Sequence, residues 1–193
     1  GAVLNGKMAG SIGDVACFSF FPSKNMAVGG EGGMICTTKP ELAEKLHRII
    51  DHGRSQSLES IELGTNIRMS EVNAAIGRVQ LKYVDKWVQT RNENASKINH
   101  TTKIREGATH AWHQLCLQRE NPDELIGSLN ENGIDARVHY PLVLNKHAVY
   151  SDHIQHDEDL PNCERLAKTL VAIPVHPHLS DSDIERINSV LNS

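Results

Sequence analysis

Near the start of the chain, apolar residues fall into two short runs that a glycine cluster separates. The first run covers residues 15–21 and ends at Pro22, and the second covers residues 34–38. Short apolar runs bounded by turn-forming residues are typical of buried strands, so both runs are predicted to be strands. The glycine cluster at residues 29–33 is predicted to form a turn, because glycine tolerates positive φ and close approach of the backbone.

Apolar positions three or four residues apart predict two helices farther along. The first begins at Pro40 and ends before Gly53, and the second begins after Ser70 and continues to near Ile98. Proline suits the first turn of a helix, and a serine hydroxyl can cap the free N–H groups of a helix start. Residues 54–69 are polar and lack a regular period, so they are predicted to be a loop.

After Thr101 the composition changes and shorter elements are expected. The pattern predicts strands over residues 112–118 and 134–140, and a helix that begins at Pro122. Two more helices are expected over residues 160–171 and 183–191, the last capped by Ser180 or Ser182. The sequence therefore predicts two domains: residues 1–101, and a small α+β domain over residues 102–193.

Composition narrows the classes of protein. Apolar residues make up 39% of the 193 residues, which supports a packed core, and the net charge of -4 argues against binding nucleic acid through bulk positive charge. No apolar run approaches the ~18–20 residues of a membrane span, and no signal peptide is visible. We therefore expect a cytoplasmic protein. Four buried, unpaired thiols are expected there, at Cys17, Cys36, Cys116 and Cys163.

Lys24 is the first candidate for chemistry. It follows an apolar run at a turn forced by Pro22, and ligands of α/β proteins bind at the carboxyl ends of strands. A free lysine has a pKa of about 10.4, but burial or a nearby cation lowers it, and the neutral amine then attacks a carbonyl to form a Schiff base. Ser19 and Ser23 could hydrogen-bond a phosphate. The residues alone leave open a solvated lysine and serines that only cap the turn.

Four segments, in order along the chain, resemble the DegT/DnrJ/EryC1/StrS aminotransferases. They are residues 10–25 with the glycine cluster that follows, residues 64–70 with the start of the next helix, His139-Tyr140-Pro141, and residues 173–180. The resemblance implies an α/β chain. Residues 1–101 would be the C-terminal part of a fold type I large domain, similar to aspartate aminotransferase, and residues 102–193 the small α+β domain.

The resemblance also implies roles. Lys24 would form the Schiff base with pyridoxal 5'-phosphate and then move the proton, and Ser19 would bind the cofactor phosphate. Asn66 would reach the phosphate held by the neighbouring subunit of a homodimer with shared active sites. Glutamate would donate the amino group to a nucleotide-linked keto-sugar, for the synthesis of sugars or cell-surface polysaccharide. No metal, nucleic acid or membrane is implied.

The chain also departs from the family. The N-terminal half is absent, with the aspartate that pairs with the pyridine nitrogen, so this chain alone is expected to be inactive and to bind the cofactor weakly. His52, Arg54 and Arg68 are expected to be structural or solvated. Two alternatives stay open: a fold type I enzyme acting on amino acids, and a non-catalytic regulatory or dimerising protein on the same scaffold.

Overall fold

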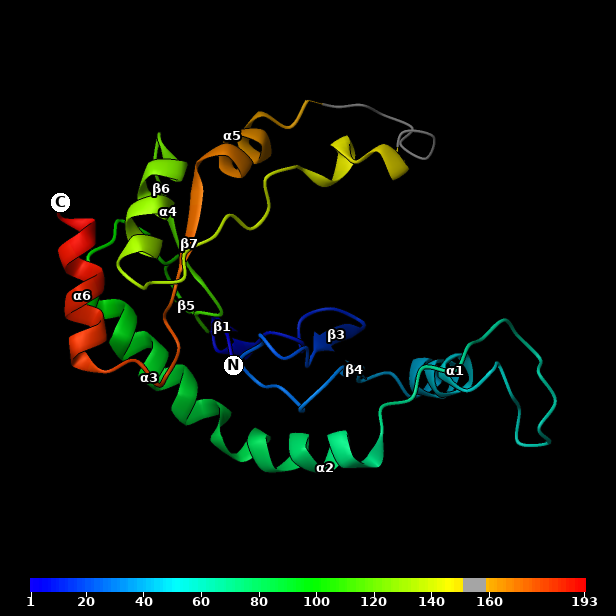
Figure 1. Ribbon diagram of the computed structural model, residues 1–193. Coiled ribbons are helices and arrows are strands. Elements are labelled where there is room, and N and C mark those ends of the chain that lie inside the picture. The colour runs from blue at the N-terminus through cyan, green and yellow to red at the C-terminus, as the bar shows by residue number, and fades with distance from the viewer. Residues whose placement is uncertain (151–158) are drawn as a thin grey trace. The chain divides into compact units, whose positions relative to one another are not determined.

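The computed structural model describes residues 1–150 and 159–193, in two compact units (Figure 1). Unit 1 comprises Gly1–Gln89 and Ile104–Ala111, and unit 2 comprises Thr90–Lys103 and Trp112–Ser193. This division does not coincide with the single boundary predicted at residue 101. The physical reason is that Ala95 and Ile98 belong to the core of unit 2, whereas a strand at residues 108–109 pairs with the N-terminus.

Unit 1 contains two small antiparallel sheets. In the three-stranded sheet, β1 (Val3–Leu4) lies between β2 (Lys7–Met8) and β5 (Ala108–Thr109). In the other sheet, β3 (Ala16–Ser19) pairs with β4 (Gly33–Cys36). The two strands predicted on either side of the glycine cluster are therefore confirmed, although both are shorter than predicted.

These two strands are not buried as the sequence predicts. The side chains of Phe18 and Met34 are 37% and 50% exposed, while the buried apolar residues of this region, Phe20 and Val28, lie in the segment that connects the strands. A sheet of two strands covers little of either of its own faces, so apolar side chains on it stay exposed. The prediction of burial was wrong for this hairpin.

The helices of unit 1 begin where the sequence predicts. Helix α1 (Pro40–Ile50) starts at the proline, and α2 (Glu71–Gln80) starts after Ser70, whose hydroxyl accepts a hydrogen bond from the backbone N–H of Asn73. The long helix predicted to reach Ile98 is instead interrupted. A single 3-10 turn, η1 (Leu81–Tyr83), separates α2 from α3 (Val84–Lys97).

Unit 2 has a hydrophobic core of its own. Strand β6 (Leu115–Gln118) pairs with β7 (Leu170–Ile173), and the side chains of Leu115, Leu117 and Leu129 are almost completely buried. The remaining elements are α4 (Pro122–Glu131), η2 (Leu144–Lys146), η3 (Ala148–Tyr150), α5 (Pro161–Thr169) and α6 (Asp181–Leu191).

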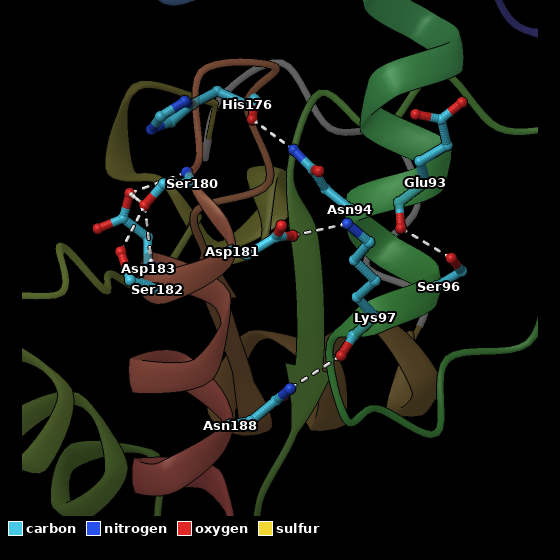
Figure 2. A network of polar contacts seen from close by, with 10 residues as sticks. All are labelled: Glu93, Asn94, Ser96, Lys97, His176, Ser180, Asp181, Ser182, Asp183 and Asn188. Carbon is cyan, nitrogen blue, oxygen red and sulfur yellow. Dashed lines mark hydrogen bonds and ion pairs between the residues drawn. The ribbon is translucent and has the colours of Figure 1, made fainter.

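Polar contacts join α3 to α6 within unit 2 (Figure 2). The ammonium group of Lys97 lies 2.7 Å from a carboxylate oxygen of Asp181, and the side-chain amide of Asn188 donates to the backbone carbonyl of Lys97. Ser180 caps α6 through a capping box with Asp183, which confirms the first of the two predicted caps. These contacts fix the last helix against the helix that leaves unit 1.

Two elements of unit 2 differ from the prediction. Residues 134–140 are not a strand: only Arg137 forms an isolated bridge, with Ala172, because the N–H of Ala136 is taken by the side-chain oxygen of Asn130. The helix predicted over residues 160–171 ends at Thr169, and the chain continues as β7. A short apolar run of this kind fits a buried strand as well as the end of a helix, so its period cannot distinguish them.

The thiols are free but not buried. Cys17 and Cys163 are exposed, and Cys36 and Cys116 are half-buried, so the expectation of four buried thiols was wrong. Cys17 and Cys36 lie on the two-stranded hairpin of unit 1, and two strands alone cannot bury the side chains on their faces. Across residues 1–150 and 159–193, no helix is long and apolar enough to span a bilayer.

Candidate functional site

Lys24 lies in the connection between β3 and β4, called here the Lys24 loop (residues 20–32). The backbone N–H of Lys24 donates a hydrogen bond of 2.9 Å to the carbonyl of Phe21, which closes a turn directly after β3. The side chain is half-buried. Among the described residues, none accepts a hydrogen bond from its Nζ or forms an ion pair with it. The backbone of Lys24 is therefore fixed, whereas its amine has no hydrogen-bond or ion-pair partner among the described residues.

Ser19 flanks the same turn, as the last residue of β3. Its Oγ accepts a hydrogen bond of 3.3 Å from the backbone N–H of Phe21. This is the turn-capping role that the local sequence left open. It uses the oxygen as an acceptor only, so the hydroxyl hydrogen can still be donated to an anion. The structure thus places Ser19 directly before the turn that Lys24 closes, at the end of β3.

Asn66 lies elsewhere, in the loop between α1 and α2. Its Oδ1 accepts a hydrogen bond of 2.8 Å from Nε of Arg68, and Arg68 also forms an ion pair of 3.3 Å with Asp51. The side chain of Asn66 is exposed, and its backbone forms an isolated bridge with Asp51. Arg68, expected to be structural or solvated, therefore holds the carboxamide of Asn66 in place.

A large open cavity of about 1090 Å³ occupies unit 1 between β4, α1 and the loop before α2. Asn66 and Arg68 lie on its wall together with mostly apolar side chains from β4 and α1. Neither Ser19 nor Lys24 belongs to its lining. Within one copy of the chain, Asn66 therefore lies on the wall of this cavity, whereas Ser19 and Lys24 lie outside its lining.

Three polar residues for which the sequence predicted no role hold the Lys24 loop. The side-chain amide of Asn25 donates to the carbonyl of Ala111 at 2.7 Å, while Asn73 and Gln80 of α2 bind the backbone of the loop farther on. Asn73 and Gln80 lie seven positions apart in a helix that was otherwise read for its apolar face. Their spacing, which puts both on one face of the helix, was the signal in the sequence that this face could bind another segment.

The residues of this turn fit the reactive end of pyridoxal phosphate. Lys24 offers an amine without a competing carboxylate, and Ser19 offers a hydroxyl donor for a phosphate. A metal is not indicated by the same test: in the described part of the chain, no three His, Cys, Asp or Glu side chains gather closely enough to hold one.

Comparison with known proteins adds several relatives. A "Pleiotropic regulatory protein" of Geobacillus stearothermophilus is 35% identical over 192 residues, which are 94% of this chain and 52% of that protein. The dTDP-3-amino-3,4,6-trideoxy-alpha-D-glucose transaminase of Streptomyces venezuelae is 31% identical over 196 residues, or 97% of this chain and 52% of the transaminase. The chain thus spans about half the length of the curated relatives it matches.

Solved structures match at the level of the fold. The crystal structure of S. venezuelae DesV, in complex with a ketimine intermediate, superposes with a TM-score of 0.91 at 30% identity. The match covers 99% of this chain and 54% of that chain. The expected α/β fold is therefore confirmed, because nearly the whole chain superposes on about half of an aminotransferase structure of this fold.

A sequence model of one family matches residues 1–192, which is nearly the whole chain. The match includes all four segments that carried the resemblance, so that resemblance is confirmed. This chain belongs to the DegT/DnrJ/EryC1/StrS aminotransferase family.

Proposed function

We propose that this chain carries the lysine-bearing part of an aminotransferase that moves an amino group from glutamate to a nucleotide-linked keto-sugar. The observation that carries the proposal is Lys24: a half-buried lysine just past β3, with no partner for its Nζ among the described residues. The family uses pyridoxal phosphate, and the relative from S. venezuelae is a transaminase of a dTDP-linked sugar.

The two residues of the turn have complementary tasks. Bound pyridoxal phosphate supplies a carbonyl carbon that an amine can attack and a ring that withdraws electrons from the substrate. The Nζ of Lys24 is the nucleophile in its neutral form, and it then accepts and returns a proton as general base and acid. The Oγ of Ser19, oriented by the N–H of Phe21, donates its hydrogen to a phosphate oxygen, which is a charge-assisted hydrogen bond.

The proposal extends to the assembly. Asn66 would bind the cofactor phosphate held by a second copy, in a homodimer with shared active sites. In support, Arg68 fixes the Oδ1 of Asn66, and the Nδ2 has no hydrogen-bond partner in the described residues, so it stays available as a donor. Residues 1–101 would belong to the fold type I large domain that binds the cofactor, and residues 102–193 to the small domain. The product would serve the synthesis of sugars or cell-surface polysaccharide.

A second candidate is a regulatory or dimerising protein on the same scaffold. The name of the relative from G. stearothermophilus, a pleiotropic regulatory protein at 35% identity, favours it. The two candidates differ at Lys24, because a scaffold has no use for an unpaired amine beside Ser19. A third candidate, a fold type I enzyme acting on amino acids, shares Lys24 and differs only in its substrate.

Chemical trapping of the lysine tests the proposal. The intact protein is incubated with pyridoxal phosphate, reduced with borohydride and digested, and the peptides are analysed by mass spectrometry. The pyridoxyl group is expected on the peptide that contains Lys24. Lys7 on β2, an exposed lysine of the same unit, is the matched control: Lys7→Arg should leave labelling unchanged, whereas Lys24→Arg should abolish it. Label on another lysine, or none, would contradict the proposal.

The amino acceptor needs a separate measurement. Nucleotide-linked keto-sugars and free 2-oxo acids are offered in turn to a separate sample of the intact protein, incubated with pyridoxal phosphate and not treated with borohydride, with glutamate as donor. Formation of 2-oxoglutarate only with the keto-sugars is the expected result. Turnover with 2-oxo acids alone would favour the amino-acid enzyme, and binding without any turnover would favour the regulatory protein.

A further inference from the structure

Two adjacent peptide groups of the Lys24 loop are bound by side chains of one helix. The N–H of Ala27 donates to Oε1 of Gln80 at 3.2 Å. The carbonyl of Val28 accepts from Nδ2 of Asn73 at 2.7 Å. Both side chains come from α2, and both are half-buried. We call this pair of side chains, Asn73 and Gln80, the α2 clamp.

The spacing of the clamp matches one face of a helix. Asn73, Gly77 and Gln80 lie four and then three positions apart, so all three face the same side. Gly77, between the two polar residues, is buried, and a Cβ at that position would lie 3.2 Å from Cγ1 of Val28. Val28 is itself completely buried. The missing side chain at Gly77 therefore allows the loop to approach near enough for both hydrogen bonds.

The clamp is one of several restraints close to Lys24 in the sequence. On one side, the N–H of Lys24 closes a turn on the carbonyl of Phe21. On the other side, the side chain of Asn25 donates a hydrogen bond to the carbonyl of Ala111, and the α2 clamp holds the backbone of Ala27 and Val28. The backbone on both sides of Lys24 is thus fixed, and the freedom that is left belongs to the lysine side chain.

The rest of the hairpin offers little additional support. β3 and β4 are two short strands whose apolar side chains are largely exposed, and the loop between them is rich in glycine. Glycine-rich backbone loses much entropy when it is fixed, so a loop of this composition needs specific contacts to hold one conformation. Position matters for a reacting amine, because a displacement of about 1 Å can lower a rate by about 100-fold.

We infer that Asn73 and Gln80 are positioning residues, which hold the backbone at Ala27 and Val28 and so fix the place from which the amine of Lys24 reacts. They touch the backbone of the loop and not the amine, so they act through it. The inference rests on the function proposed above for Lys24. It adds two residues of α2 to the site. Asn73 acts as a hydrogen-bond donor to the loop and Gln80 as an acceptor from it, so each should affect the reactivity of Lys24 only while it can keep that role.

That direction gives a matched pair of variants. Asn73→Asp and Gln80→Glu each replace an amide by a carboxylate of the same shape and add the same charge. At position 73 the amide is needed as a donor to Val28, and a carboxylate cannot donate. At position 80 only an oxygen acceptor for Ala27 is needed, and the carboxylate keeps it. Asn73→Asp also keeps the Oδ1 that Ser70 contacts at the start of α2.

Two readouts on the intact, cofactor-free protein test the inference. The first is hydrogen exchange of the peptide that contains Ala27 and Val28. The second is the rate at which an amine-specific reagent modifies Lys24, measured as a function of pH. In Asn73→Asp and Gln80→Leu, exchange should be about tenfold faster or more. The pH profile of Lys24 should shift in both, while in Gln80→Glu both readouts should stay near those of the original protein.

A control separates positioning from stability. Oδ1 of Asn130 accepts a hydrogen bond of 3.1 Å from the N–H of Ala136 in unit 2, the same type of bond as that of Gln80. Asn130→Leu should lower stability without changing either readout at the loop. The inference is overturned if Gln80→Glu is as damaging as Asn73→Asp. It is also overturned if Asn73→Asp and Gln80→Leu lose stability as Asn130→Leu does but keep the original Lys24 profile.

The experiment also separates failure of the inference from failure of the proposed function. If borohydride fixes the cofactor on a lysine other than Lys24, the proposed function fails. Exchange and amine modification still decide whether the clamp controls the amine, since neither needs the cofactor. If the original protein is labelled at Lys24 and the clamp variants are labelled at the same rate with unchanged exchange, the inference fails and the proposed function stands.

Discussion

The buried side-chain amide of Asn94 donates a hydrogen bond of 2.9 Å to the backbone carbonyl of His176, which lies 82 positions later in the chain (Figure 2). Asn94 belongs to the part of α3 that lies in unit 2, and His176 precedes α6. The bond therefore ties the entry of unit 2 to its last helix. This hydrogen bond is partly buried, so removing its donor should have a measurable effect on stability.

Asn94→Leu should lower the free energy of unfolding of unit 2 by about 1–3 kcal/mol, because leucine has the same branched shape but cannot donate to His176. Urea unfolding followed by the fluorescence of Trp112, in a Trp87→Phe background, reports on this unit. Ser96→Ala is the control: that exposed hydroxyl binds only the carbonyl of Glu93 in its own helix. Equal losses in the two variants would contradict the assignment.

Leu129 should be among the most sensitive core positions. Its side chain is completely buried in the core of unit 2. Leu129→Ala should therefore cost about 2–5 kcal/mol, the sum of lost burial and of the cavity left behind. The same fluorescence assay measures it. Leu144→Ala, where the side chain is 74% exposed, should change the free energy of unfolding little. A small effect at Leu129 would mean that the core is not packed as described.

Asp183 should make unit 2 sensitive to acid. The hydrogen bonds from the side chain and then the backbone of Ser180 lower the pKa of Asp183, and Arg186 adds to the effect. A carboxylate with a lowered pKa stabilises the fold above its unfolded pKa of about 3.9, and this stability is lost as the pH falls through the folded pKa. The free energy of unfolding should therefore fall more steeply below about pH 4 than it does in Asp183→Asn.

The control for this pH dependence is Asp123→Asn. Asp123 lies in the first turn of α4, where the preceding Asn121 makes no side-chain cap. That variant should keep the steep acid limb of the original protein. An Asp183→Asn protein with an unchanged acid limb would show that the capping box does not govern the acid response.

Asn66 is predicted to act on the site of a second copy. If it does, mixing Lys24→Ala subunits with Asn66→Ala subunits of the intact protein should raise activity above that of either parent, because one site of each hybrid dimer regains both residues. The measurement requires Asn66→Ala to be impaired by about tenfold, or about 1.4 kcal/mol. If both residues served the same site in one chain, mixing would restore nothing. A fully active Asn66→Ala would show that Asn66 is only a loop residue.

The starts of helices could be predicted because their signals are local. Pro40 and Ser180 stand at the first turn or the cap, and the structure begins α1 and α6 there. The end of the helix predicted to reach residue 171 could not be predicted in the same way. Whether Leu170–Ile173 continues a helix or forms a strand depends on β6, its partner in the sheet, which is distant in the sequence.

In the candidate site, too, local motifs could be recognised in the sequence, whereas contacts between distant segments could not. Lys24 and Ser19 stand in a continuous motif, so the resemblance to the family singled them out as candidates, although the residues alone left their roles open. Asn73 and Gln80 were not found, because a polar residue on an amphipathic helix is normally assumed to face solvent. Only the position of Val28 against Gly77 reveals that this face of α2 meets the loop.

The pairing of β1 with β5 joins two strands that the ribosome makes at widely separated times. Val3–Leu4 is made long before its partner, Ala108–Thr109, which follows only after α1, α2 and α3. One edge of β1 is therefore open during the synthesis of all three helices, and an open strand edge invites pairing with other chains. The nascent protein must protect that edge until residue 109 emerges, by which point the first helix of unit 2 has already been made.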